Sequence, residues 1–202
     1  MHHRNIKYLT EQDEVLNKII QTIPLPPQES TNNVFHDLLS CIIEQQIHYR
    51  STKKTFQKLL AQTGLDELTT ANFPILEEKG LKNIKLSMRK YETIGRIVEF
   101  FESHTLDWGA MKDEDVEQAL SKIKGVGNWS IKMILLYTLQ RPDVFPADDY
   151  HLKQIMIKLY NIDTAAKVKA QLKAVAGNWS PCKSIGVRYL LAWKEHQKNA
   201  VI

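Results

Sequence analysis

The chain has few cysteines, few glycines and no long apolar run, and each shortage excludes a class of protein. Its 202 residues include two cysteines, Cys41 and Cys182, too few for a disulfide framework or a four-thiolate metal site. Alternating strand-like runs are scarce, and hairpin dipeptides such as Asn-Gly are absent among the 8 glycines. No apolar run approaches the roughly 20 residues needed to cross a bilayer, and the N-terminus lacks an apolar signal region. We therefore expect an intracellular protein with reduced thiols and no membrane anchor.

The charge balance is mildly basic. Lys and Arg number 27 against 23 Asp and Glu, which gives a formal net charge of +4. This excess permits a polyanionic partner without requiring one, since many enzymes carry as much charge. Hydrophobic residues make up 43% of the chain, enough for a packed core, so the composition does not predict disorder.

The apolar residues recur at helical spacing. One buried helix face is indicated by the i, i+3, i+4, i+7, i+8 pattern of Phe35, Leu38, Leu39, Ile42 and Ile43. Similar spacing returns further along the chain, at 94–101, 133–137 and 189–193. The sequence predicts an all-α protein of about ten helices.

Cap residues and helix breakers divide these helices. Thr10 is predicted to be the N-cap of a first helix, and Asp113 to cap a later one. The prolines of 24–27 predict a stiff connector. Gly64 and Gly80 are predicted helix ends.

The segment 120–130 carries the strongest functional signal. A helix is predicted to end near Ile123, and a new helix to start at about Asn128. Between them, Gly125 and Gly127 are expected to take positive φ and expose their amides. Backbone amides at a helix start bind anions such as phosphate oxygens, and Lys122 and Lys124 would add positive charge. A plain corner between two helices is the alternative.

The neighbouring residues favour the phosphate-binding hairpin. The segment closely resembles the hairpin of the helix-hairpin-helix DNA glycosylases: Ile123-Lys124-Gly125-Val126-Gly127-Asn128-Trp129-Ser130. The run 141–154 resembles the catalytic segment of that family, in which an aspartate after a turn opens the next helix. Asp149 follows Gly125 by 24 positions, the spacing of the alkylpurine branch. The resemblance is to the DNA-3-methyladenine glycosylase II group.

Three further segments resemble the family. Residues 85–91 are similar to a Ser-x-Arg-Lys helix start, and 179–184 to a C-terminal Trp-x-Pro-x-Arg-Ser segment. Residues 43–47 resemble the turn that inserts side chains into the DNA gap, which implies DNA-binding roles for Gln45, Gln46 and Ile47. Related enzymes often have a leucine in place of Gln46, and a solvated turn at a helix end is the alternative.

The resemblance implies a fold of two packed helical lobes that contains the hairpin motif. We expect one glycosylase unit over residues 1–202. Lobe one would cover about 31–145, and lobe two about 1–30 together with 146–202. The DNA cleft, with Asp149 in it, would lie between the lobes.

Asp149 is the implied catalytic residue. Cleavage of an N-glycosidic bond builds positive charge on the deoxyribose, and a fixed carboxylate stabilises that charge more in the transition state than in the ground state. The neighbouring Asp148 is expected to cap a helix that begins at Asp149. The helix dipole by itself also favours acidic residues at such a position.

Trp129 stands where relatives that also nick the backbone have a Schiff-base lysine. The resemblance therefore implies a monofunctional enzyme that leaves an abasic site, with Lys132 pointing elsewhere. Trp129 and Tyr150 match pocket positions that would stack on an alkylated purine, although each is also a candidate core residue. The usual pocket tryptophan falls at Leu191, with Trp193 two positions later.

The family also implies the partners. These are double-stranded DNA containing damaged bases and no membrane, and we expect a monomer. Catalysis would need no metal or other cofactor, two cysteines cannot hold an iron–sulfur cluster, and a structural monovalent cation is allowed at the hairpin. The protein would act in the cytoplasm or nucleoid of a prokaryote, or in the nucleus of a eukaryote.

Three alternatives stay open from the residues. The first is a non-catalytic hairpin protein that only binds DNA, with strong salt dependence. The second is a glycosylase for oxidised or deaminated bases. The third is a helical scaffold with a chance Gly-Val-Gly turn, which five matching segments disfavour.

Overall fold

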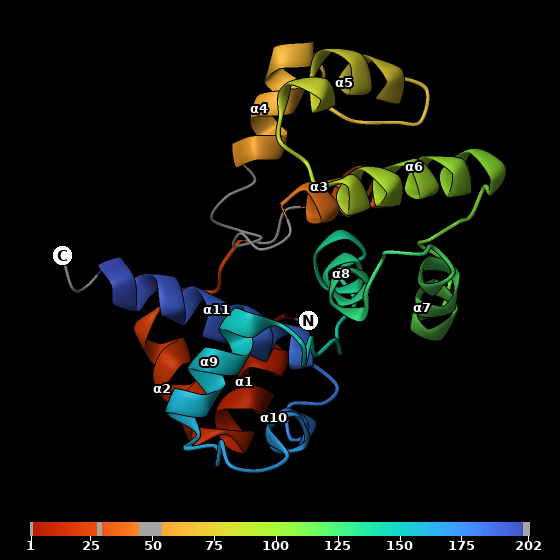
Figure 1. Ribbon diagram of the computed structural model, residues 1–202. Helices are drawn as coiled ribbons and strands as arrows, with labels where there is room; N and C mark the ends of the chain where they lie inside the picture. The colour runs from red at the N-terminus through yellow and green to blue at the C-terminus, as the bar shows by residue number, and fades with distance from the viewer. Residues whose placement is uncertain (1, 28–29, 45–53, 200–202) are drawn as a thin grey trace. The chain divides into compact units, whose positions relative to one another are not determined.

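The chain folds into helices. The computed structural model describes residues 2–27, 30–44 and 54–199, which form eleven α-helices, a short 3-10 helix and a π-helical segment, with no strand among them (Figure 1). The all-α prediction is confirmed. None of the helices in these ranges combines the length and the apolar character needed to span a membrane.

The chain divides into two compact units. The central unit consists of residues 30–139, and the terminal unit of residues 1–29 together with 140–202. The central unit contains α3 (Val34–Ile43), α4 (Lys54–Thr63), α5 (Phe73–Lys79), η1 (Leu81–Asn83), α6 (Met88–Ser103), α7 (Asp113–Ser121), α8 (Asn128–Met133) and η2 (Ile134–Thr138). The terminal unit contains α1 (His2–Gln12), α2 (Glu14–Thr22), α9 (Tyr150–Leu159), α10 (Val168–Gly177) and α11 (Lys183–Asn199).

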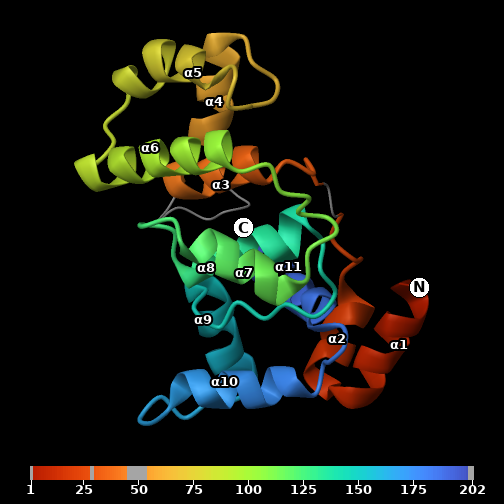
Figure 2. The ribbon, with the colours of Figure 1, turned by 90° about the vertical axis from the view of Figure 1, so that its right-hand side faces the viewer.

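Helix α3 forms the core of the central unit. All of its residues are buried, and it packs against α6, α8 and η2; α3 and α6 run side by side in Figures 1 and 2. The helix also buries a carboxylate, Asp37, which accepts hydrogen bonds from the hydroxyls of Thr31 and Thr138, each at 2.8 Å. A buried charge needs such donors. Asp37 therefore joins the two ends of the unit.

In the terminal unit, α11 packs against α1, α2 and α9. Asp13 links the N-terminal helices to the C-terminal part of the chain. Its carboxylate accepts the backbone N–H of Leu16 at 2.9 Å, the indole N–H of Trp179 at 2.7 Å and the hydroxyl of Tyr160 at 2.8 Å. Trp179 is completely buried. These bonds explain why the first 29 residues belong with the last 63 rather than with the segment that follows them.

Two predicted helix caps were wrong. Thr10 lies inside α1, where its hydroxyl donates to the carbonyl of Lys7 at 2.7 Å; Asp13 is the capping residue, at the start of α2. Lys112 is the N-cap of α7, and Asp113 is its first helical residue. The acidic first turn of α7 still fits the helix dipole. Gly64 follows α4 with φ +69° and Gly80 caps α5, so these predicted helix ends are confirmed.

Candidate active site

The hairpin between α7 and α8 is a tight turn with one left-handed residue. The Val126 N–H donates to the Ile123 carbonyl at 3.0 Å, which closes a four-residue turn. Gly125 has φ +106°, a conformation that favours glycine. Gly127, the N-cap of α8, has φ −97°. The expectation that both glycines take positive φ was therefore wrong for Gly127.

The two glycines face different surroundings. A Cβ on Gly125 would lie 2.2 Å from the hydroxyl oxygen of Thr93, a buried residue of α6. A Cβ on Gly127 would meet nothing within 4 Å. Packing inside the central unit therefore requires glycine at 125. It does not require glycine at 127, where the missing side chain leaves open space in front of the backbone.

Three cations surround the hairpin. Lys122 and Lys124 are exposed and form no ion pair with any described residue. Arg96 of α6 donates from Nη1 to the carbonyl of Lys124 at 3.4 Å and pairs from Nη2 with Glu92 at 3.0 Å. Arg96 was not among the residues predicted from the sequence, because nothing in the local pattern of α6 marks the residue that faces the hairpin.

Trp129 is the second residue of α8 and is half-buried. Lys132, one turn later, forms an ion pair with Glu117 of α7 at 2.5 Å. This pair connects the two helices of the motif. Lys132 is thus engaged with α7, and the expectation that it points elsewhere than the chemistry stays a prediction.

Asp149 lies at the start of α9 in the terminal unit. It is the N-cap, with extended backbone, and its Oδ1 accepts the N–H of Leu152 at 2.8 Å. The side chain is only 7% exposed. A hydrogen-bonded carboxylate at a helix N-terminus has its orientation fixed and its negative charge favoured by the helix dipole.

Asp148 does not cap the helix, and that expectation was wrong. Its carboxylate is exposed and pairs with Lys169 of α10 at 2.5 Å. The helix starts one residue later than expected, at Tyr150, so the capping position falls to Asp149. One residue therefore has both the capping geometry and the position of the family's aspartate.

The segment before Asp149 is anchored to the start of α11. Asp143 accepts hydrogen bonds from the side chains of Lys183 at 2.6 Å and Ser180 at 2.8 Å. Burial by itself would raise the pKa of Asp143, but these bonds and the backbone N–H of Lys183 lower it on balance. Ser184 donates to the Arg141 carbonyl at 2.6 Å and accepts the Val144 N–H at 3.0 Å. Two segments that resemble the family separately, 141–154 and 179–184, thus hold each other in place.

Tyr150 is 65% exposed at the first position of α9. Its ring meets that of His151 edge to face, with centroids 5.1 Å apart. The Nδ1 of His151 contacts the ammonium of Lys194 on α11. On the same helix Trp193 stacks on His196, with centroids 5.4 Å apart, and its buried indole N–H has no acceptor among the described residues. Leu191 is half-buried.

Gln45, Gln46 and Ile47 lie outside the described residues. The residues on either side of that segment are joined: the Glu44 carboxylate accepts the Phe56 N–H at 2.8 Å. Lys90 donates to the Ile43 carbonyl at 3.0 Å, at the end of α3. Burial lowers the pKa of Lys90, and the Glu44 carboxylate opposes that shift.

The predicted site residues fall into two groups. The central unit brings together Lys124, Gly125, Val126, Gly127 and Trp129 at the hairpin. The terminal unit brings together Asp149 and Tyr150 at the start of α9. Within the described ranges, no three His, Cys, Asp or Glu side chains gather as ligands for a metal ion.

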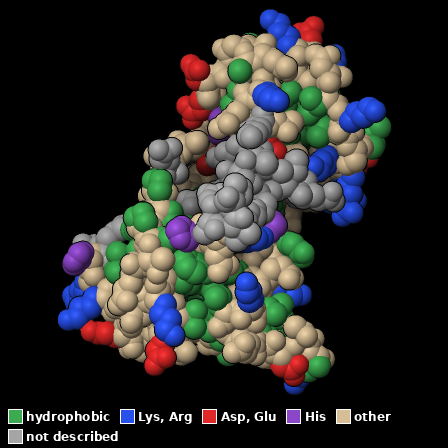
Figure 3. Space-filling model, turned by 90° about the vertical axis from the view of Figure 1, so that its left-hand side faces the viewer, with side chains coloured by type: hydrophobic (Ala, Val, Ile, Leu, Met, Phe, Trp, Pro, Cys, Tyr) green, Lys and Arg blue, Asp and Glu red, His purple; other side chains and the backbone are tan. Residues whose placement is uncertain are grey.

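Charge is not concentrated on the face shown in Figure 3. Lys and Arg side chains are scattered over the described part of this face, with Asp and Glu side chains among them. The described part of this face therefore carries no single basic patch.

A comparison with known proteins identifies the family of this chain. The family described as "HhH-GPD superfamily base excision DNA repair protein" matches residues 39–181. YfjP of Bacillus subtilis, named as a candidate DNA-3-methyladenine glycosylase, is 26% identical over 167 residues, which are 78% of this chain and 58% of YfjP. DNA-3-methyladenine glycosylase 1 of Schizosaccharomyces pombe is 26% identical over 129 residues, 59% of this chain and 54% of that protein.

A solved structure shares the fold. The 3-methyladenine DNA glycosylase of Schizosaccharomyces pombe in complex with abasic DNA has a TM-score of 0.77 at 21% identity, and the match covers 93% of this chain and 95% of that one. The chain spans a little over half the length of the two curated relatives above. The family match takes in the hairpin, Asp149 and most of the chain. The chain belongs to the HhH-GPD superfamily of base excision DNA repair proteins.

Proposed function

We propose that this protein is a monofunctional DNA glycosylase that removes alkylated purines of the 3-methyladenine and 7-methylguanine type and leaves an abasic site. The observation that carries the proposal is the placement of Asp149. Its carboxylate is nearly buried, fixed by the Leu152 N–H and preceded by a segment that Asp143 and Ser184 anchor to α11. A residue that only capped a surface helix would not need this support.

The proposed chemistry uses a preorganised negative charge. A base within a duplex is out of reach, so the damaged nucleotide is first flipped into the enzyme. As the bond between base and sugar breaks, positive charge develops on the deoxyribose. The Asp149 carboxylate stabilises this charge and orients the attacking water. Because Asp149 is already held by a hydrogen bond, little reorganisation accompanies the reaction.

The hairpin is proposed to hold the DNA backbone. Gly127 has open space where a Cβ would be, so a phosphate can approach its backbone closely. Lys124 adds an unpaired positive charge beside it. The related Schizosaccharomyces pombe structure contains abasic DNA, the product type that this reaction would generate. We further propose that a monovalent cation binds at the hairpin, where the Ile123 and Lys124 carbonyls each accept one hydrogen bond and keep a second lone pair.

Two residues support a reaction without strand cleavage. Trp129 occupies the position of the Schiff-base lysine of bifunctional relatives, and an indole cannot form an imine. Lys132, the nearest lysine on the same helix, is paired with Glu117. We propose that Trp129 and the exposed Tyr150 ring stack on the flipped base, since aromatic faces attract the positive charge of an alkylated purine.

The test is base release from methylated DNA. Purified protein is incubated with methylated duplex DNA, and free 3-methyladenine and 7-methylguanine are measured by chromatography. We expect release of both bases, no effect of chelators, and no strand break until alkali is added. If the protein binds DNA and releases neither these bases nor deaminated or oxidised ones, it is a binding protein. Release of only oxidised or deaminated bases would reassign the substrate.

The cellular location follows from the proposed substrate, and the oligomeric state is proposed with it. We propose that the protein works as a monomer on damaged double-stranded DNA inside the cell, in the cytoplasm or nucleoid of a prokaryote or the nucleus of a eukaryote. Size-exclusion chromatography with light scattering, with and without a duplex, tests the monomer.

A further inference from the structure

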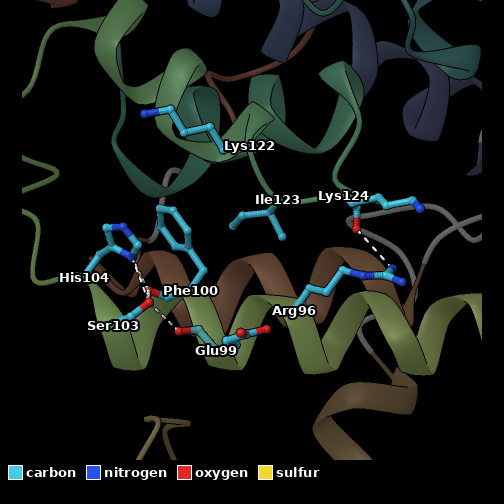
Figure 4. A pocket seen from close by; sticks show the side chains of 8 residues that line it. All are labelled: Arg96, Glu99, Phe100, Ser103, His104, Lys122, Ile123 and Lys124. Atoms are coloured by element: carbon cyan, nitrogen blue, oxygen red, sulfur yellow. Dashed lines mark hydrogen bonds between the residues drawn. The ribbon is translucent and has the colours of Figure 1, made fainter.

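A pocket of about 290 Å³ lies in the central unit between α6 and the turn that follows α7 (Figure 4). We call it the α6 pocket. Its central wall is Ile123, the buried residue that accepts the hydrogen bond closing the hairpin turn. Lys124, which lines the pocket, immediately precedes Gly125. The pocket is therefore continuous along the chain with the proposed phosphate-binding hairpin, but none of the functions assigned above uses it.

One end of the α6 pocket is cationic. Arg96 lies there below Lys124, and its guanidinium is held by the Lys124 carbonyl and by Glu92 (Figure 4). A guanidinium fixed in this way loses little side-chain freedom when it binds an anion. Lys124 forms no ion pair with a described residue, so its charge stays available.

The other end is aromatic. Phe100 and His104 are stacked, with ring centroids 4.4 Å apart and planes inclined by 14°. His104 is fixed through Nδ1, which lies 2.9 Å from the Phe100 carbonyl oxygen and 2.9 Å from the Ser103 hydroxyl. Figure 4 shows this pair below Lys122 and separated by Ile123 from the Arg96 end. His104 is exposed, so the pair presents a flat surface to a ligand.

The lining is net positive. Three cationic residues, Arg96, Lys122 and Lys124, line the pocket together with one carboxylate, Glu99. Cationic groups at both ends of an apolar wall, with a stacked aromatic pair at one end, match the alternation of phosphate and base along a nucleic-acid strand. An acidic peptide would use the cations but would gain little from the aromatic pair.

We propose that the α6 pocket binds the DNA strand next to the nucleotide held by the hairpin. One phosphodiester lies at the Arg96 and Lys124 end, the next lies near Lys122, and a sugar or base rests on the Phe100–His104 pair. This inference rests on the proposed function only in taking DNA as the polymer that the hairpin holds. The pocket extends the DNA footprint away from Gly125 along α6.

The experiment measures binding of the full chain to a duplex with a central abasic site, by fluorescence anisotropy over a range of salt concentrations. The variants are Lys122→Gln and His104→Ala, with Lys82→Gln, an exposed lysine of η1 outside the pocket, as matched control. We expect Lys122→Gln to reduce the slope of log K against log salt by about 1. His104→Ala should weaken binding severalfold with an unchanged slope, since it removes stacking rather than a fixed charge. Lys82→Gln should match the wild type.

A second arm locates the contact. Duplexes are shortened step by step on one side of the abasic site and then on the other. Shortening one side should weaken wild-type binding, and on that shortened DNA Lys122→Gln should cause no further loss. Thermal melts of all variants check that the fold is kept.

The outcomes separate the two proposals. If the wild type binds DNA and both pocket variants keep its affinity and salt slope, the α6 pocket is not a DNA site. The proposal is then overturned, and an acidic protein partner becomes the ligand to test. If the wild type releases no base but the pocket variants lower the salt slope and affinity as expected, the pocket proposal stands and the glycosylase proposal fails.

Discussion

The Cβ that Gly125 lacks would lie 2.2 Å from the Thr93 hydroxyl oxygen. Thr93 is buried in α6, and its hydroxyl donates to the Arg89 carbonyl at 2.8 Å, so it is held against the turn. Gly125 is therefore packed against α6, a helix that ends 22 positions before it in the sequence. This contact fixes the turn in front of which a phosphate is proposed to bind.

The two hairpin glycines should respond differently to alanine. Gly125→Ala places a side chain at positive φ and against Thr93, and we expect a loss of about 1–3 kcal/mol from backbone strain, with overpacking adding to it. Thr93→Ala in the same chain removes the two nearest atoms and should recover part of that loss. Urea unfolding of the two single variants and the double variant measures the coupling.

In Gly127→Ala the added methyl would lie in open space, and the backbone φ at this position is one that alanine adopts without strain. The free energy of unfolding should therefore change little. The added methyl would stand in the proposed path of the phosphate. An overpacking cost of about 1–3 kcal/mol corresponds to a loss of roughly tenfold or more in DNA affinity. A Gly127→Ala protein that binds DNA like the wild type would remove the hairpin from the proposed interface.

Asp149 can be tested without disturbing its helix. Asparagine caps helices about as well as aspartate, so Asp149→Asn should keep the fold while base release falls on the order of 100-fold or more. Asp149→Ala should lose the activity and also about 1 kcal/mol of stability, because the Leu152 N–H loses its acceptor. The readouts are base release from methylated DNA and thermal unfolding.

Asp148→Asn is the matched control for that experiment. It breaks the exposed pair with Lys169, for which we expect a stability change below about 1 kcal/mol and nearly full activity. If Asp149→Asn stays active and Asp148→Asn does not, the catalytic assignment moves by one residue.

The anchor of the catalytic segment should make stability depend on pH. The pKa of Asp143 is lower in the folded chain than in the unfolded chain, so its contribution is full above the unfolded value of about 4 and is lost as the pH falls through the folded value. Asp143→Asn should therefore cost on the order of 1 kcal/mol at pH 7, with a difference from wild type that shrinks toward pH 2. Urea unfolding at several pH values tests this, and an equal difference at every pH would contradict it.

Asp13 should be a large contributor to the stability of the terminal unit. Asp13→Ala leaves the buried Trp179 indole without its acceptor, at about 1–3 kcal/mol, and removes the cap of α2, at about 1 kcal/mol. Tyr160 loses its acceptor as well; burial and then the Asp13 charge raise the pKa of this tyrosine, so it acts as a donor.

Glu11→Ala, which removes an exposed pair with Lys7, is the control for Asp13→Ala. It should change the free energy of unfolding by less than about 0.5 kcal/mol in the same urea titration.

Sequence by itself determined the helical class and the hairpin turn, whereas the catalytic role of Asp149 stays a prediction. Helical periodicity and the lack of strand signals come from local side-chain spacing, which is read directly from the chain. The turn at 123–126 was found because only glycine serves well at the positive φ of Gly125.

The tertiary structure decided what depends on contacts between distant segments. Thr10 looks like a cap in sequence, but Asp13 took that role because Trp179 and Tyr160 converge on it from the far end of the chain. Likewise, Asp148 was drawn to Lys169 on α10, which left the cap to Asp149. Arg96 of α6 faces the hairpin, and the Phe100–His104 stack lines the same pocket as Arg96. The partners of Asp13, Asp148 and Arg96 lie 21 to 166 positions away, and no local propensity encodes which of them will meet.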